Sequence, residues 1–343
     1  MLKKKLLKMT FLLGGFGPFH LSSRNKLLVL TYHRFSRAGH PCRVTASQFR
    51  AHLNYLRKHV TVISLSKAVR GIAGELQLPT NATVITIDDG YHDAYEIAFP
   101  ILKEFQFPAT LFAVTEFVNG GSWIWTDYLR FIVLANGAGG KRFEWQGQSY
   151  DLSCMTLASK LQLADTVNSK LKEMSVFDRS QCISDIAKQR SITLPDRPPS
   201  EYAAATIGQL REMDTSNLRI ESHTATHPIL TRIAQVDLKA ELEASRSFLG
   251  NVLNRDIRFF CYPNGNVSDK VRMAVEKAGY TAAVTTEFGL NATYTDPFML
   301  RRIDSPSSIE SFAQYASGFE SFRQRVRRPV KSKSSNKSYN YAK

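Results

Sequence analysis

The chain has 343 residues, of which 43% are hydrophobic and 22% are charged. That length allows one large core with room for an insertion, and the modest content of Gly and Pro indicates that most of the chain folds. No internal repeat or heptad run is present, which excludes solenoid and coiled-coil architectures.

The net charge of +15 is concentrated at the two ends of the chain. Residues 1–74 hold 14 basic and no acidic residues, and residues 321–343 hold 8 basic and no acidic residues, whereas residues 75–320 have a net charge of −7. Basic ends predict either contact with an anionic surface, such as a membrane, or solvated tails. No nucleic-acid-binding module is recognisable, so nucleic acid is not a predicted partner.

Residues 1–25 are a basic and apolar segment. Lys8 interrupts its apolar stretch, and several glycines together with Pro18 weaken any helix there. The stretch is too short to span a bilayer and no A-x-A cleavage site follows it, so we expect it to lie on a membrane surface. Because the four cysteines are widely spaced and suggest no disulfide framework, the cytoplasm or the periphery of the inner membrane is favoured over secretion.

Strands and helices are predicted to alternate from residue 26 onward. Apolar and β-branched runs at 26–32, 82–87 and 109–114 predict buried strands, and helical spacing predicts helices over 45–58 and 94–105. Strands joined by crossover helices run parallel to one another.

The alternation resumes after residue 205. Strands are predicted at 218–221, 257–261 and 281–285, with helices near 238–252 and 268–279. This pattern suits an α/β barrel or an open doubly wound sheet.

Residues 118–205 interrupt the alternation and are predicted to be a mostly helical insertion, closed by several prolines. The predicted organisation is therefore an N-terminal segment (1–25), one domain (26–325) that carries this insertion, and a basic disordered tail (326–343).

Asp88 and Asp89 follow the predicted strand 82–87 directly, in the sequence T-I-D-D-G. Catalytic groups gather at the carboxyl ends of parallel strands, and successive residues diverge there, so the two carboxylates can have different roles. An ordinary loop in which one aspartate caps a helix is the alternative.

His223 and His227 are four residues apart in H-T-A-T-H-P. On one helical turn they would face the same way, and two imidazoles with one carboxylate make an open three-ligand site for a divalent metal. A hydrolase uses the open position for water. A pair of solvent-facing histidines at the start of a helix is the alternative.

Two further motifs close predicted strands. His33 ends the first strand in T-Y-H, and Tyr262 and Asn264 follow a later strand in C-Y-P-N-G. Alone, His33 is compatible with a structural histidine and residues 260–265 with a simple turn.

Together these motifs resemble the polysaccharide deacetylase family, which shares the nodulation-factor deacetylase homology domain. Residues 86–90 match its T-F-D-D-G motif with Ile87 in place of Phe, residues 108–112 match P-A-T-x-F, and residues 223–228 match H-S/T-x-x-H-P. The Y-H, Y-P-x-G and D-P-F-x-L-x-R-I motifs, the last at 296–303, are similar to the branch of biofilm poly-N-acetylglucosamine deacetylases.

The resemblance covers roughly residues 26–118 and 206–305 and implies a distorted (β/α) barrel. It implies that Asp88 is the general base and that a divalent metal ion, usually zinc, is the cofactor; the ligands it implies are Asp89, His223 and His227. The metal would polarise an acetyl carbonyl, and a backbone N–H near residues 262–264 would help to stabilise the oxyanion.

The chain departs from the family pattern in two motifs. No histidine follows His227, so the L-x-x-H histidine that donates a proton in many members is absent, and His33 is the predicted donor or an orienting group for Asp88. Cys261 and Asn264 replace Arg and Tyr of the R-P-P-Y motif, and Arg302 is predicted to orient the base instead.

The function predicted on this basis is removal of N-acetyl groups from a glycan that contains N-acetylglucosamine, in exopolysaccharide or envelope biosynthesis. Carbohydrate O-acetyl ester hydrolysis would use the same core, and a non-catalytic glycan-binding or scaffold protein is the third alternative. Tyr262, Asn264 and Trp125 are predicted to contact the substrate, although core packing is the commoner use of Trp. The oligomeric state is left open.

Overall fold

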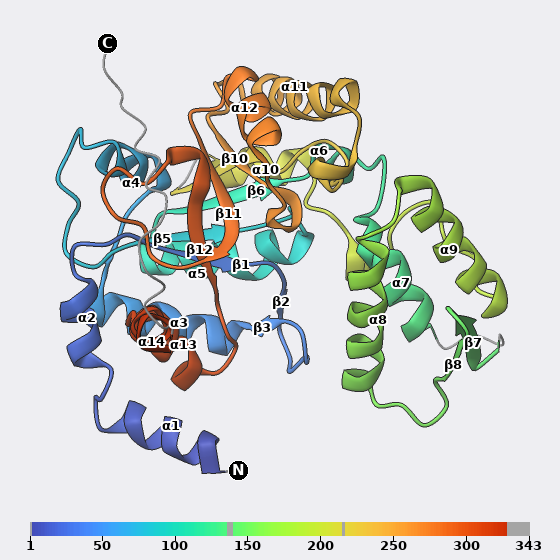
Figure 1. Ribbon diagram of the computed structural model, residues 1–343, viewed down its shortest axis with the longest axis horizontal. Coiled ribbons are helices and arrows are strands. Elements are labelled where there is room, and N and C mark those ends of the chain that lie inside the picture. Colours follow the sequence, from blue (N-terminus) through green and yellow to red (C-terminus); the bar gives the residue numbers. More distant parts are fainter. Residues whose placement is uncertain (1, 136–139, 215–216, 328–343) are drawn as a thin grey trace.

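A computed structural model describes residues 2–135, 140–214 and 217–327. Its centre is a closed barrel of parallel strands, in which β1 pairs with β12 on one side and with β5 on the other (Figure 1). The predicted (β/α) barrel is therefore confirmed. Around the barrel the strands follow the order β1 (Leu28–Tyr32), β12 (Leu300–Asp304), β11 (Ala282–Phe288), β10 (Phe259–Cys261), β9 (Leu218–Ser222), β6 (Ala109–Ala113) and β5 (Ala82–Ile87), and β4 (Thr61–Val62) pairs with the start of β5.

The barrel strands are buried on both faces, which is why they consist of apolar and β-branched runs. In β5, Ala82 and Val84 belong to the cluster that fills the barrel, whereas Ile85 and Ile87 belong to the cluster between the barrel and its helices. Side chains alternate in this way along a strand, so Asp88 continues the inward row that Thr86 belongs to. The helix α4 (Leu65–Ile72) contributes to the inner cluster at the end of the barrel where the strands begin.

Helices of the outer layer occupy the predicted crossovers. The first of these helices, α3 (Ala46–His59), begins at a capping box formed by Thr45 and Gln48. This capping box fixes the N-terminus of the predicted helix 45–58. The predicted helix 94–105 is a π-helical turn (Ala94–Ala98) that continues into α5. The outer helices are α3 (Ala46–His59), α5 (Phe99–Phe105), α10 (Ile207–Asp214), α11 (Gln235–Leu253), α12 (Asp269–Lys277) and α13 (Ile309–Ala316).

The insertion lies beside the barrel and has its own apolar core (Figure 1). It is mostly helical, as predicted, but it also contains a β-hairpin that the sequence analysis did not predict. Tyr91 of the barrel donates a 2.5 Å hydrogen bond to the buried Asp127 of the insertion and so ties the two parts together. The elements of the insertion are α7 (Trp125–Leu134), β7 (Arg142–Trp145), β8 (Gln148–Asp151), α8 (Leu157–Leu171) and α9 (Val176–Gln189), and the short α6 (Thr115–Val118) before them lies against α11 of the barrel.

The N-terminal segment forms α1 (Leu2–Leu12) and α2 (Gly17–Ser23), which are separated where Gly14 has a φ of +70°. The chain continues to α14 (Phe319–Arg327), so the predicted basic tail begins inside a helix, and residues 328–343 lie outside the described residues. Within the described ranges, no helix is long and apolar enough to cross a membrane.

The remaining strands, β2 (Phe35–Ser36) and β3 (Val44–Thr45), form a separate small sheet.

Candidate metal and catalytic site

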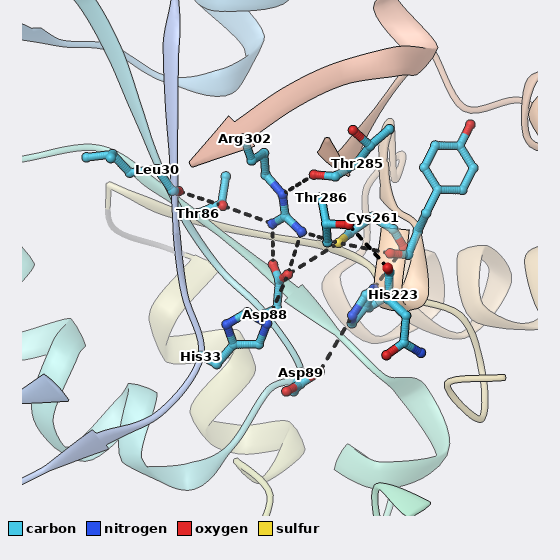
Figure 2. Close-up of polar contacts among 12 residues, drawn as sticks. Leu30, His33, Thr86, Asp88, Asp89, His223, Cys261, Thr285, Thr286 and Arg302 are labelled. Atoms are coloured by element: carbon cyan, nitrogen blue, oxygen red, sulfur yellow. Dashed lines mark hydrogen bonds and ion pairs between the residues drawn. The ribbon is translucent and has the colours of Figure 1, made fainter. Parts of the chain in front are cut away.

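The sequence-predicted polar residues gather at the barrel mouth where the strands end. Asp88 and Asp89 follow β5, His223 follows β9, His33 follows β1, and Arg302 projects inward from β12. Figure 2 shows Arg302, Cys261 and His33 around Asp88, and His223 turned toward Asp89. Since all barrel strands run in parallel, their carboxyl ends meet at this one rim.

The three predicted metal ligands converge on one point. Oδ1 of Asp89 is 3.5 Å from Nε2 of His223 and 3.6 Å from Nε2 of His227, and all three donor atoms lie within 4.8 Å of one another. All three residues are buried. The prediction that Asp89, His223 and His227 come together is thus confirmed in its geometry.

The prediction that the two histidines share a helical turn is wrong. Residues 223–227 form a loop in which Thr224 and His227 have φ values of +71° and +60°, in the left-handed region that a right-handed helix cannot use. Asp89 also has a positive φ, of +76°. Two of the three converging side chains therefore depend on unusual backbone conformations, which are commonly held in place at functional sites.

Glu241 of α11 holds the histidine loop in this conformation. Its Oε2 accepts hydrogen bonds from the backbone N–H groups of Ala225 and Thr226, at 2.8 and 2.9 Å, and its Oε1 accepts one from the Thr226 hydroxyl at 2.6 Å. The sequence analysis missed Glu241, because an acid on the polar side of a predicted helix carries no signal of this contact.

Hydrogen bonds and burial also determine the protonation states of the three candidate ligands. Nδ1 of His223 lies 2.8 Å from the carbonyl oxygen of Cys261, so it carries the proton there and leaves Nε2 as a lone-pair donor. Burial lowers the pKa of His227 to about 3, which favours its neutral form. Burial alone would raise the pKa of Asp89, but the hydrogen bond with His223 and the nearby imidazoles hold it below its usual range, which favours the carboxylate.

These residues fit a divalent metal ion. One carboxylate oxygen and two imidazole nitrogens form a donor set that can hold a divalent ion and leave one coordination position for water. Nδ1 of His223 has the backbone partner that such ligands usually have, whereas Nδ1 of His227 is buried without a hydrogen-bond partner.

Arg302 binds Asp88 through both carboxylate oxygens. Its Nη1 donates to Oδ1 at 2.8 Å and its Nη2 to Oδ2 at 2.7 Å, and its Nε donates to the carbonyl of Thr285 at 2.8 Å. Burial alone would raise the pKa of Asp88, but the Arg302 guanidinium outweighs it and keeps the pKa below its usual range. The predicted contact between Arg302 and Asp88 is confirmed.

Cys261 adds a contact that the sequence analysis noted only as a departure from the motif. Its thiol donates to Oδ2 of Asp88 at 3.4 Å and accepts from Nη2 of Arg302 at 3.2 Å. A motif arginine at this position would compete with Arg302 for the same carboxylate, so the small buried thiol is compatible with the guanidinium arriving from β12.

His33 lies at the solvent side of the same carboxylate. Its Nε2 is 3.7 Å from Oδ2 of Asp88, and about half of its side chain is exposed. It is therefore not the buried structural histidine of the alternative interpretation. The position allows contact with both Asp88 and a bound substrate.

A cavity of about 350 Å³ opens above these residues and extends to the insertion. Asp88, Asp89, His33, His223 and His227 form its floor. The other lining residues that bear on function are Arg43, Arg130, Lys172, Glu201, Asn264 and Tyr202.

The three residues predicted to contact the substrate differ in their position relative to the cavity. Asn264 lines the cavity, and its buried Nδ2 has no hydrogen-bond partner. Tyr262 borders the cavity, but its ring is fully buried against Phe260, with centroids 5.3 Å apart, so it is unlike an exposed sugar-stacking platform. The prediction for Trp125 is wrong: it is buried in the core of the insertion with the Arg179 guanidinium 4.1 Å above its ring, and core packing was the better interpretation.

The fold and the site define a parallel (β/α) barrel with three convergent candidate metal ligands and a buried carboxylate beside them at its mouth. The family model described as polysaccharide deacetylase matches residues 76–135 and 199–283, and the gap between the two matched stretches falls in the insertion. The chain belongs to the polysaccharide deacetylase family.

Curated relatives agree with this assignment. The chain is 22% identical over 279 residues to YxkH of Bacillus subtilis, a protein named for the same family, covering 81% of this chain and 71% of that one. It is 24% identical over 278 residues to the poly-β-1,6-N-acetyl-D-glucosamine N-deacetylase of Escherichia coli K12, covering 79% of this chain. The matched region spans only 35% of that relative's length.

Solved structures share the fold. The Streptococcus pyogenes deacetylase PplD, solved in complex with acetate, superposes with a TM-score of 0.58 at 18% identity, covering 85% of this chain and 99% of that one. IcaB from Ammonifex degensii superposes with a TM-score of 0.57 at 19% identity, covering 85% and 97%.

Proposed function

We propose that this chain is a metal-dependent carbohydrate deacetylase that hydrolyses N-acetyl groups of a glycan containing N-acetylglucosamine. The observation that carries the proposal is the position of Asp88, which Arg302 holds beside the convergent donors of Asp89, His223 and His227. A base next to an open metal site is what attack of water on an acetyl group requires. The name of the Escherichia coli relative supports a poly-N-acetylglucosamine substrate.

The proposed cofactor is Zn²⁺, because one carboxylate and two imidazoles suit it. When bound, the ion supplies Lewis-acid polarisation of the acetyl carbonyl and lowers the pKa of water. Asp88 then accepts the proton of the water that attacks the carbonyl carbon. The low pKa of Asp88 keeps it ionised and ready to act as a base at neutral pH.

His33 is the proposed donor of the proton that the leaving amine needs when the C–N bond breaks. Its half-exposed ring, 3.7 Å from Asp88, can receive a proton from that carboxylate and deliver it toward the cavity. This role supplies the step for which many members of the family use a later histidine.

One backbone donor near the turn after β10 is the proposed partner of the oxyanion. The N–H of Tyr262 already donates to the carbonyl of Val284, and Pro263 has no N–H, so Asn264 is the candidate that remains of the three residues. The unpaired Nδ2 of Asn264 is a second donor available to a substrate hydroxyl or acetyl oxygen.

Acetate release from a panel of N-acetylated and O-acetylated oligosaccharides tests the proposal. We expect release from N-acetylglucosamine oligomers, loss of release with a chelator, recovery with Zn²⁺, and loss in Asp88→Asn. Release that resists the chelator, or full activity of Asp88→Asn, would refute the mechanism. Release from O-acetyl esters alone would favour the esterase alternative, and binding without turnover would favour a scaffold protein.

We also propose that the enzyme lies on the anionic surface of the inner membrane. The N-terminal helices meet the C-terminal helix on one side of the fold: the Phe319 ring packs against Phe16 and Phe19, with centroids 5.8 and 4.8 Å apart, and the Ser23 hydroxyl donates to the Ser317 carbonyl. α1 projects from the fold beside this contact (Figure 1). Exposed apolar side chains of these helices are Leu6, Met9, Leu12, Leu13, Leu21, Phe322 and Val326, and Lys5 and Lys8 are exposed with them.

Co-sedimentation with vesicles tests this location. Exposed apolar and basic side chains predict binding to phosphatidylglycerol vesicles that exceeds binding to phosphatidylcholine vesicles and weakens with salt. Leu12→Asp combined with Leu13→Asp should abolish it, whereas Val236→Asp, at an equally exposed site on α11, should not. Equal binding of both variants to the anionic vesicles would contradict the proposal.

A further inference from the structure

The catalytic cavity has a basic wall that the proposed reaction does not use. Where the cavity meets the insertion, it is lined by Arg130 of α7 and by Lys172, the residue that follows α8. Arg34, just before β2, and Arg43, just before β3, add two more cations to the lining. Removal of an acetyl group from a neutral sugar gives these charges no role.

Three of the four cations, the arginines, already have carboxylate partners. Nη1 of Arg130 is 3.1 Å from Oδ1 of Asp127, and its Nη2 is 2.8 Å from Oδ1 of Asp165. Nη2 of Arg43 is 2.7 Å from Oε1 of Glu201, and Nε of Arg34 is 2.7 Å from Oδ2 of Asp93. The ion pairs of Arg130 lie within the insertion, and that of Arg43 reaches the end of the insertion, so these contacts give the arginines a structural role.

Lys172 is different, since no carboxylate forms a salt bridge with it in the part of the chain that the structure describes. The side chain is partly buried. Burial lowers its pKa, the charge of Arg130 lowers it further, and only Asp165, which Arg130 already holds, opposes these effects. Burial and the like charge of Arg130 both disfavour the charged ammonium of Lys172. An anion that binds beside this ammonium would therefore stabilise it.

Lys172 is also close to the chemistry. It lines the same cavity as Asp89, His223 and His227. An anion at Lys172 would therefore belong to the molecule whose acetyl group lies at the metal ligands, and not to a separate surface site.

We propose that Lys172 binds a carboxylate or phosphate group of the glycan, so that the preferred substrate is an acidic glycan in which the charged group neighbours the N-acetylated sugar. Arg130 adds to the positive field at this position. The inference rests on the proposed deacetylase function for its reaction and adds the substrate class, which the insertion determines.

The test compares kcat/KM for acetate release from three matched N-acetylated oligosaccharides that are neutral, contain a uronate or carry a phosphate ester. A charge-assisted hydrogen bond to a partly buried cation predicts a preference of about tenfold for one of the charged substrates. Lys172→Gln should reduce that preference to near unity, mainly through KM, and Lys172→Arg should restore part of it. Which charged substrate is preferred identifies the anion.

Lys170→Gln is the matched control. Lys170 lies in the last turn of α8, two residues before Lys172, and its substitution removes the same charge, but its ammonium lies 5.3 Å from the centre of the Trp145 ring and does not line the cavity. This variant should keep both the activity and the preference of the wild type. A wild type without preference for either charged substrate, or an equal loss of preference in both lysine variants, would overturn the proposal.

Equilibrium binding separates this inference from the proposed reaction. The same oligosaccharides are titrated into the zinc-loaded Asp88→Asn variant, with and without the additional Lys172→Gln substitution. Tighter binding of a charged oligosaccharide that depends on Lys172 supports the anion site even if no substrate releases acetate, a result that would contradict the deacetylase proposal alone. Binding that is the same with and without the Lys172→Gln substitution contradicts the anion site alone.

Discussion

Arg302 of β12 and Asp88, which follows β5, form a bidentate ion pair across the barrel mouth, with N–O distances of 2.8 and 2.7 Å. Both side chains are only 2% exposed. The guanidinium fork matches the two carboxylate oxygens and leaves Asp88 a single orientation. Arg302 is thus a positioning residue for the proposed base.

Arg302→Lys keeps the charge but loses the fork, so Asp88 should move away from its working position. We expect kcat for acetate release to fall about 100-fold with little change in bound zinc, because small misplacements of a catalytic group have effects of that size. Arg302→Met, which leaves the buried Asp88 carboxylate without its partner, should lower the free energy of unfolding by roughly 3–5 kcal/mol in urea denaturation. An Arg302→Lys variant with unchanged kcat would contradict the positioning role.

The two neighbouring aspartates should respond differently to the same substitution. Asp89→Asn removes a proposed ligand, and since loss of an outer-sphere partner alone costs about 10–100-fold in metal affinity, we expect zinc affinity to fall by at least about 100-fold. Asp88→Asn should retain zinc while losing turnover. Zinc content after dialysis, measured by atomic emission, checks both; equal zinc retention would show that Asp89 is not a ligand.

His33→Gln separates the two roles predicted for this histidine. If His33 donates the proton to the leaving group, turnover of an N-acetyl substrate should fall by about 100-fold or more, whereas hydrolysis of an aryl acetate, whose phenolate leaves without a proton, should be nearly preserved. Zinc content should be unchanged. An equal loss with both substrates would point to the orienting role instead, and loss of zinc would make His33 a ligand.

Acid stability depends on buried histidines away from the site. Burial lowers the pKa of His52 to about 4, and its ring stacks on Phe312 with centroids 3.9 Å apart. The unfolded chain binds a proton near pH 6.5 and the folded chain only near pH 4, so stability is lost as pH falls from 6.5 to 4, by roughly 3 kcal/mol at most. His52→Gln should make the free energy of unfolding less dependent on pH in this window; an unchanged slope in urea titrations would contradict this account.

The sequence by itself determined the parallel α/β class from its pattern, and the barrel and the identity of the central residues through the family resemblance. Buried parallel strands are continuous apolar runs, and a motif that directly follows such a run must lie at the common rim, so the placement of Asp88, Asp89 and His223 was predictable from local pattern alone. The strand that carries Arg302, β12, was not among the predicted strands, and only the family resemblance pointed to this residue.

Only the tertiary structure decided how the remaining side chains are used. The left-handed conformations at Thr224 and His227 depend on the contacts of their loop with Glu241, and local spacing, which suggested a helical turn, cannot report a partner on another helix. The burial of Trp125 and the approach of Lys172 to the cavity likewise follow from how the insertion packs against itself and the barrel. These outcomes rest on contacts between residues far apart in the chain, which periodicity and motif spacing do not encode.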